Sequence, residues 1–211
     1  MSLRGRFFAL TYDRQLAKVE KAGLRTLREG LLAGVSGRVL EIGAGTGANL
    51  PLYGAAVESL MLTEPEKPML RRLQRRVGEQ APRTTVLQAP AEDLPFEDDT
   101  FDTAVSTLVL CGVSDQPRVL GELRRVLRPG GQLLFLEHVR SDDARLARLQ
   151  DRMNGLNRFV AGCECNRSTL DSIREAGFEV TQLEHTTMHK VPRFVRPLIV
   201  GAATAPADVP H

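Results

Sequence analysis

The chain has 211 residues, of which 42% are hydrophobic and 26% charged, and this balance is that of one globular domain. Lys and Arg number 28 against 26 Asp and Glu, so the formal charge is only +2 and does not suit a nucleic-acid binder that depends on a basic field. No apolar run approaches the roughly 20 residues that cross a bilayer. Three cysteines are too few for a disulfide scaffold. We therefore expect a reduced, cytoplasmic protein, monomeric or homodimeric, with no transmembrane segment and no nucleic-acid partner.

Short apolar runs alternate with helical patterns along most of the chain. An amphipathic helix is predicted over about 13–32, because apolar residues recur there at spacings of three and four. Strands are predicted at 38–42, 60–63, 84–87, 101–107, 132–137, 178–184 and 196–201. Further helices are predicted near 68–78, after 114–115, at 144–157 and at 168–176. This alternation of strands and helices indicates an α/β fold with a parallel sheet covered on both faces.

The strongest chemical signal is a glycine-rich turn after the first predicted strand. Gly43, Gly45 and Gly47 let the backbone pass close to a ligand, although their spacing alone also fits a loose dinucleotide fingerprint. Glu41 precedes them and would repel a pyrophosphate but attract a ligand that carries an ammonium and a sulfonium. Glu64 closes the second strand and is placed to accept hydrogen bonds from ribose hydroxyls. Together these residues indicate S-adenosylmethionine (SAM) as the cofactor and disfavour a nicotinamide dehydrogenase.

Three segments resemble the class I SAM-dependent methyltransferases. Residues 39–49 (VLEIGAGTGAN) are similar to motif I of that family, residues 91–102 (AEDLPFEDDTFD) to its adenine-cupping segment, and residues 123–131 (LRRVLRPGG) to the helix and turn before strand five. The resemblance implies a Rossmann-like fold with a seven-stranded, mostly parallel sheet, helices on both faces and an antiparallel last strand. It also implies that Ala91 and Glu92 lie at the adenine edge.

We expect one methyltransferase domain over residues 1–204. Within it, residues 1–36 would form a helical cap and residues 139–170 a substrate-covering insertion, while residues 205–211 would be a disordered tail. By the same resemblance, Thr107 and Leu108 would lie beside the methionine portion of the cofactor and Tyr12 would cover it. The full expected cofactor-binding set is Tyr12, Glu41, Gly43, Ala44, Gly45, Gly47, Asn49, Glu64, Pro65, Met69, Ala91, Glu92, Thr107 and Leu108.

A narrower resemblance, to thiol S-methyltransferases, runs through the second half of the chain. The segments that carry it are residues 106–116 (STLVLCGVSDQ), 135–139 (FLEHV), 161–167 (AGCECNR) and 195–201 (VRPLIVG). It implies methyl transfer to a small thiol by in-line displacement. His138 is the candidate catalytic residue, because α/β sheets place their ligands at the carboxyl ends of the strands. The candidate substrate residues are Cys111, Asn157, Asn166 and Arg167.

Other readings stay open. The acceptor atom could be carbon, oxygen or nitrogen in a quinone precursor, a phospholipid headgroup or a natural-product intermediate, and residues 12–13 and 94–96 fit a quinone-type branch. The chain could also be a SAM-binding module without turnover. Cys163 and Cys165 lack the two-residue gap and the second pair that are typical of zinc sites, so the sequence predicts no metal.

Overall fold

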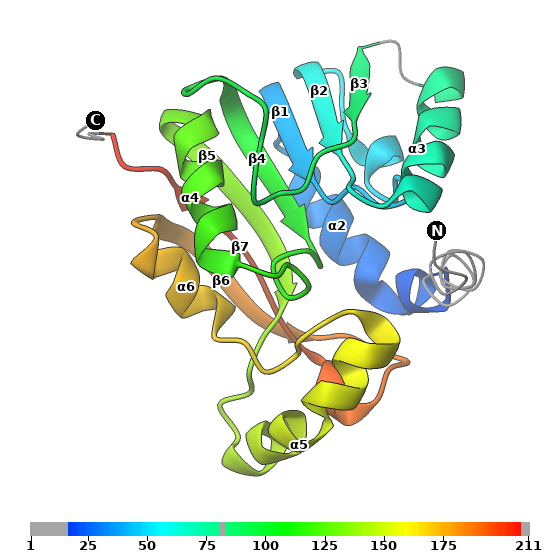
Figure 1. The fold of residues 1–211 in the computed structure, drawn as a ribbon, viewed down its shortest axis with the longest axis vertical. Helices are drawn as coiled ribbons and strands as arrows, with labels where there is room; N and C mark the ends of the chain where they lie inside the picture. The colour runs from blue at the N-terminus through cyan, green and yellow to red at the C-terminus, as the bar shows by residue number, and fades with distance from the viewer. Residues whose placement is uncertain (1–16, 81–82, 208–211) are drawn as a thin grey trace.

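The computed structural model describes residues 17–80 and 83–207. A single seven-stranded sheet with the strand order β3-β2-β1-β4-β5-β7-β6 lies at the centre of this part of the chain, and helices pack around it (Figure 1). The strands are β1 (Gly37–Ile42), β2 (Val57–Thr63), β3 (Thr84–Leu87), β4 (Phe101–Thr107), β5 (Leu127–His138), β6 (Glu179–Thr187) and β7 (Pro197–Thr204). Strands β1 to β5 pair in parallel, and β7 is antiparallel to both β5 and β6. The predicted fold class is confirmed.

The helices fall close to their predicted positions. They are η1 (Glu20–Leu24), α2 (Arg25–Leu32), η2 (Leu50–Leu52), α3 (Lys67–Gln80), α4 (Gln116–Val126), α5 (Ala144–Ala161), α6 (Thr169–Glu175) and η3 (Arg193–Val195). Asp115 caps α4, because its carboxylate accepts the N–H of Arg118 at 3.1 Å. Helix α5 continues four residues beyond its predicted end, to Ala161, and Gly162 with a φ of +71° ends it in the left-handed conformation.

Strand β5 begins at Leu127, five residues before its predicted start. The turn-like Pro-Gly-Gly sequence within it does not end the strand, because the register with β4 shifts between Phe101 and Thr103 and absorbs the irregularity. Beyond β7, Ala205 is buried and exchanges backbone hydrogen bonds with Gly130 and Gly131, so ordered chain continues into the segment predicted as a tail.

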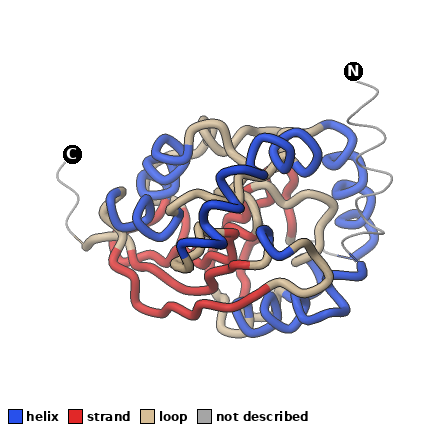
Figure 2. The backbone as a smooth tube through the Cα atoms, turned by 90° about the horizontal axis from the view of Figure 1, so that it is seen from below, coloured by secondary structure: helices blue, strands red, loops and turns tan. Residues whose placement is uncertain are grey.

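Two hydrophobic cores lie on opposite faces of the sheet. Successive sheet residues belong to different cores: Leu40 packs with α4 and α6 in one, and Val39 packs with α2 and α3 in the other. Side chains alternate in this way because neighbouring residues of a strand point to opposite faces. Figure 2 shows helices on both sides of the sheet. Burial on both faces fixes the register of the strands, and with it the positions of the side chains at their ends.

The carboxyl ends of β1, β2, β4 and β5 meet along one edge of the sheet, and α5 lies beyond this edge (Figure 1). This is the edge at which parallel sheets bind ligands. Within the described residues, no helix has the length and apolar character needed to span a membrane.

Candidate functional site

The turn after β1 gives a ligand access to the backbone. Its glycines have positive φ angles: Gly43 (+55°), Gly45 (+60°) and Gly47 (+86°). A Cβ on Gly43 would lie 2.8 Å from the side chain of Val109, so packing requires glycine there. At Gly45 the nearest atom to such a Cβ is Met69 Sδ at 3.9 Å, which leaves open space over the turn. The pocket at this turn is lined by Arg28, Glu41, Gly43, Ala44, Gly45, Thr46, Ala48 and Thr107.

Glu41 is the buried carboxylate of this pocket. Its side chain is only 3% exposed, and it accepts hydrogen bonds from Asn49 Nδ2 at 3.0 Å and from the Tyr53 hydroxyl at 2.7 Å. Burial raises the pKa of Glu41 to about 7, although the Tyr53 hydrogen bond, the charge of Arg28 and the Asn49 hydrogen bond each act to lower it. A cation beside Glu41, such as an ammonium group on a ligand, would stabilise its ionised form.

Arg28 is a second buried charge at the pocket, and the sequence did not reveal it. It is 4% exposed, and its Nη1 donates to Asn49 Oδ1 at 2.8 Å and to Thr107 Oγ1 at 2.7 Å. Its Nε pairs with Glu20 at 3.0 Å. Arg28 lies within the predicted amphipathic helix, but residue spacing alone does not distinguish a buried arginine from an exposed one.

Glu64 lies at the end of β2 and faces the glycine turn. Its two oxygens accept the backbone N–H groups of Gly45 and Glu66, both at 2.8 Å. Burial raises the pKa of Glu64, and these backbone hydrogen bonds oppose the increase. The contacts orient the carboxylate beside the turn that Glu41 also flanks. Pro65 follows Glu64, and its exposed carbonyl accepts a hydrogen bond from Gln88 at 3.0 Å.

The residues expected at the adenine end make mainly structural contacts. Ala91 is buried, and the carboxylate of Glu92 accepts hydrogen bonds from the N–H and hydroxyl of Ser114 at 3.0 and 2.8 Å. Burial is the largest single effect on the pKa of Glu92 and acts to raise it, but the hydrogen bonds from Ser114 and from nearby backbone N–H groups together outweigh it and lower the pKa. Leu108, expected beside the methionine portion of the cofactor, has a φ of +61° and donates its N–H to a carbonyl of β5. Tyr12 lies outside the described residues.

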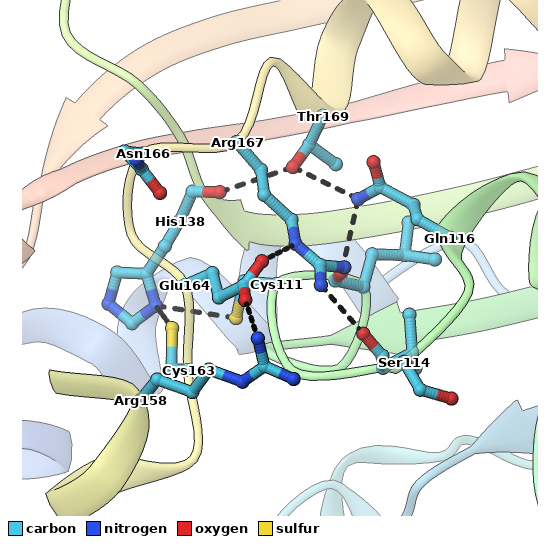
Figure 3. Close-up of polar contacts among 12 residues, drawn as sticks. Cys111, Ser114, Gln116, His138, Arg158, Cys163, Glu164, Asn166, Arg167 and Thr169 are labelled. Carbon is cyan, nitrogen blue, oxygen red and sulfur yellow. Dashed lines mark hydrogen bonds and ion pairs between the residues drawn. The ribbon is translucent and has the colours of Figure 1, made fainter. Parts of the chain in front are cut away.

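On the acceptor side, His138 ends β5 and is 6% exposed. Its Nδ1 lies 3.6 Å from Cys111 Sγ and 3.4 Å from Cys163 Sγ (Figure 3). Its Nε2 is buried and has no hydrogen-bond partner among the described residues. No local sequence pattern predicted that these three side chains meet, because they come from separate segments. Cys165 is buried outside this group, and its carbonyl accepts a hydrogen bond from Gln150 at 2.7 Å.

Glu137, the neighbour of His138, is fully buried and holds the loop after β4. Its carboxylate accepts the Ser106 hydroxyl at 2.7 Å and the backbone N–H groups of Val109, Leu110 and Cys111 at 3.0, 3.1 and 3.2 Å. Burial raises the pKa of Glu137, and these hydrogen bonds oppose the increase. The loop runs from Thr107 in the pocket at the glycine turn to Cys111 beside His138, so Glu137 fixes the path between the two regions.

The other candidate substrate residues hold the insertion together. Asn157 donates to the carbonyl of Cys163 at 2.7 Å, and Asn166 donates to Asp151 at 3.0 Å. Arg167 pairs with Glu164 at 2.7 Å and donates to two carbonyls of the loop after β4 at 3.1 and 2.8 Å (Figure 3). The insertion is thereby fastened to the loop that carries Cys111. Contact of these three residues with a substrate stays a prediction.

Comparisons with known proteins identify a family. Residues 40–135 match the family model described as a methyltransferase domain. The chain is 31% identical over 204 residues to the thiol S-methyltransferase TMT1A of Homo sapiens, covering 93% of this chain and 82% of that protein. It is 35% identical over 141 residues to a phosphatidylethanolamine N-methyltransferase of Cereibacter sphaeroides, covering 66% of this chain and 68% of that protein.

A solved structure from Thermotoga maritima, a SAM-dependent methyltransferase described as a possible histamine N-methyltransferase, is also similar. It matches with a TM-score of 0.72 and 25% identity over 97% of this chain and 100% of that chain. The pocket at the glycine turn fits SAM, because Glu41 offers a buried anion and Gly45 leaves space that a Cβ would fill. The chain therefore belongs to the class I SAM-dependent methyltransferases, enzymes that use SAM as the methyl donor.

Proposed function

We propose that this methyltransferase acts on the sulfur of a small thiol. The observation that carries the proposal is the similarity to TMT1A over 93% of the chain. That span extends well beyond residues 40–135, which match the general methyltransferase domain, into the segments around His138 and the insertion. The similarity therefore includes the part of the chain expected to contact the acceptor.

The chemistry of a thiol acceptor makes modest demands on the protein. Bound SAM supplies an electrophilic methyl group. The thiolate sulfur forms a bond to the methyl carbon as the sulfonium–methyl bond breaks, and the two opposite charges neutralise each other, which a dry site favours. A thiol with a pKa near 8.5 is about 3% ionised at pH 7, so ionisation costs roughly 2 kcal/mol. One residue that stabilises the ionised acceptor is sufficient.

His138 is the residue we assign to that task. It ends β5 at the ligand-binding edge of the sheet, is 6% exposed, and lies beside two sulfur atoms. The loop held by Glu137 joins it to the cofactor pocket, since Thr107 lines that pocket and Cys111 follows four residues later. We assign SAM binding to Glu41, Asn49, Glu64 and the glycine turn.

A nitrogen acceptor is the second candidate, because the relative from Cereibacter sphaeroides is a phosphatidylethanolamine N-methyltransferase. That similarity covers 66% of this chain, compared with 93% for the thiol enzyme. Amine or phospholipid turnover is therefore the outcome that competes with thiol turnover.

The test is an acceptor assay on the purified full chain. Thiophenol, phenol and aniline share one ring and differ only in the acceptor atom, and vesicles of phosphatidylethanolamine provide the lipid headgroup. S-adenosylhomocysteine formed above the uncatalysed rate measures turnover, and Glu41→Gln is the control for dependence on the cofactor pocket. We expect turnover of thiophenol. Turnover of phenol, aniline or the lipid without turnover of thiophenol would overturn the proposal.

A further inference from the structure

The contact between His138 and two cysteines has the composition of a metal site. The donor atoms of Cys111, His138 and Cys163 all lie within 4.8 Å of one another. They come from the loop after β4, the end of β5 and the loop after α5 (Figure 3). Thiolates and imidazole are the ligands preferred by zinc.

The distances agree with tetrahedral zinc coordination. Zinc lies about 2.3 Å from a thiolate sulfur and about 2.0–2.1 Å from an imidazole nitrogen, so a tetrahedral angle places the sulfur and nitrogen about 3.6 Å apart. His138 Nδ1 lies 3.6 Å from Cys111 Sγ and 3.4 Å from Cys163 Sγ. We propose that Cys111, His138 and Cys163 bind one zinc ion, through the two sulfurs and Nδ1.

Two sulfur atoms compete for one imidazole nitrogen in this group. An imidazole nitrogen has either one proton or one in-plane lone pair, yet two sulfur atoms lie against Nδ1 of His138. A metal ion satisfies all three donor atoms at once. Two thiolates and one Zn²⁺ also sum to zero charge, so the site without an acceptor would hold no net charge. Zinc on Nδ1 leaves the imidazole proton on Nε2.

Surrounding side chains form hydrogen bonds with the backbone of each proposed zinc-binding residue. Glu137 accepts the N–H of Cys111 at 3.2 Å, and Asn157 donates to the carbonyl of Cys163 at 2.7 Å. The carbonyl of His138 itself is 3.4 Å from Thr169 Oγ1. Such outer contacts orient metal ligands before the metal binds. They give Asn157 a positioning role that does not require contact with a substrate.

The sequence did not predict this site because the three zinc-binding residues are far apart along the chain. The motif Cys163-Glu164-Cys165 suggested a pair, but Cys165 is buried outside the cluster. The ligand spacing is 27 residues from Cys111 to His138 and 25 from His138 to Cys163. The pairing of β4 with β5 brings Cys111 to His138, and the path of the insertion brings Cys163 to both.

Three protein ligands leave one coordination position open, which in zinc enzymes is taken by water or substrate. Resting on the proposed function, we assign that position to the acceptor thiolate. The thiol S–H bond breaks, the proton passes to solvent, and a Zn–S bond forms as water leaves. In this arrangement His138 stabilises the ionised acceptor indirectly, by binding the zinc ion to which the acceptor thiolate is bound. Cys111 is the fourth residue after Thr107 in the cofactor pocket, so at most about 14 Å of chain joins the two regions.

The first test measures metal binding on the full chain, reduced with a phosphine. Zinc content is measured by mass spectrometry of the metal, and cobalt(II) is substituted as a spectroscopic probe of thiolate coordination. We expect one zinc per chain and the intense visible absorption of tetrahedral cobalt. A reduced protein that binds no zinc at micromolar free metal, or that gives a cobalt spectrum without thiolate bands, would overturn the proposal.

Matched variants identify the ligands. Cys111→Ser, Cys163→Ser and His138→Gln should each weaken zinc binding at least about 100-fold. Cys165→Ser is the control, since it removes a buried cysteine from the same motif and should keep the affinity of the parent chain. Calorimetric binding of SAM, measured on every variant, reports folding independently of the metal. Equal loss of zinc in Cys165→Ser and Cys163→Ser would contradict the assignment.

The acceptor position has its own test. Addition of 2-mercaptoethanol to the cobalt-substituted protein should shift the visible absorption, whereas ethylene glycol, its oxygen counterpart, should not. Zinc binding without this thiol-dependent shift would overturn the acceptor assignment and leave the metal site standing. Absence of thiol turnover in the acceptor assay would overturn the proposed function, and the zinc stoichiometry would be unaffected.

Discussion

The side-chain amide of Asn49 separates Glu41 from the positive charge of Arg28. Asn49 donates Nδ2 to Glu41 Oε1 at 3.0 Å and accepts Arg28 Nη1 at 2.8 Å through its Oδ1. The buried carboxylate and the buried guanidinium are therefore linked through an amide. Glu41 keeps a raised pKa of about 7, and its charge remains available to a cationic ligand.

This arrangement predicts that SAM affinity depends on pH. Without ligand, the pKa of Glu41 is about 7, and the ligand's ammonium favours the ionised form. Well below pH 7 the affinity should fall about ten-fold per pH unit, because Glu41 must lose a proton to bind the cation. On the alkaline side, the amino group of the ligand loses its charge near pH 8, so affinity should be greatest between about 7 and 8. Calorimetric titration across this range measures the profile.

The control is Glu41→Gln, which should bind SAM weakly and lose the acidic limb of the profile.

The stability of the ligand-free protein should depend on pH in the opposite direction to SAM affinity, and should fall as the pH rises toward 7. The pKa of Glu41 is raised on folding, so its stabilising contribution is present below about 4.5 and is lost as the pH rises through about 7. An acidic limb that persists unchanged in Glu41→Gln would assign the titration to another group.

Replacement of Arg28 should destabilise the protein. Arg28→Met removes the partner of Glu20 and the buried guanidinium that donates to Asn49 and Thr107, so we expect a loss of about 3 kcal/mol in the free energy of unfolding. It should also move the acidic limb of SAM binding to higher pH, since the charge of Arg28 lowers the pKa of Glu41. Urea unfolding and the calorimetric profile measure the two effects.

Arg25→Met is the matched control. Arg25 lies on the same helix, is 61% exposed and pairs with Glu29 four residues along. Its replacement should cost less than about 0.5 kcal/mol. Similar losses in the two variants would show that Arg28 has no special role in the pocket.

The sequence predicted those features of the site that depend on residues near one another in the chain, and missed those that depend on contacts between distant segments. Glu41 lines the pocket at the glycine turn and Glu64 bonds to that turn, and because both lie close to the strands that position them, local pattern and charge were sufficient to predict that they flank it. Arg28 and Glu137 were missed because burial of a charge is decided by packing between elements, and their local spacing is ordinary. The approach of Cys111 to Cys163 depends on the path of the insertion, which no local pattern encodes.

A substitution in the glycine turn should affect stability and SAM binding separately, through different physical effects. Gly45→Ala adds a methyl group with no atom nearer than 3.9 Å, so it should cost only the strain of a positive φ, about 1–2 kcal/mol. The same methyl group occupies the space over the turn, and SAM affinity should fall at least about ten-fold, or more than 1.4 kcal/mol. Urea unfolding and calorimetry measure the two effects.

Gly43→Ala is the comparison. Its new Cβ would lie 2.8 Å from the side chain of Val109, so packing strain adds to backbone strain and the loss of stability should exceed that of Gly45→Ala. Tight SAM binding by Gly45→Ala would mean that the ligand does not pass over this residue.

Glu137 should be among the most sensitive positions for stability. Glu137→Ala leaves the N–H groups of Val109, Leu110 and Cys111 without their acceptor in a buried region, and each unpaired group costs about 1–3 kcal/mol. We expect a total loss of at least about 3 kcal/mol in urea unfolding, after partial relaxation of the loop. Glu137→Gln keeps one acceptor oxygen and should lose less.

The exposed Glu58 provides the control, because Glu58→Ala removes a carboxylate from the surface of β2 and should change stability by less than about 0.5 kcal/mol. Hydrogen exchange on Glu137→Ala should show faster exchange at the amides of residues 109–111, since these amides lose the carboxylate that protects them. If these amides stayed protected and stability matched that of Glu58→Ala, the loop after β4 would be held by its other contacts. Arg167, which donates to the carbonyls of Leu110 and Val113, would then be the residue that fixes Cys111 beside His138.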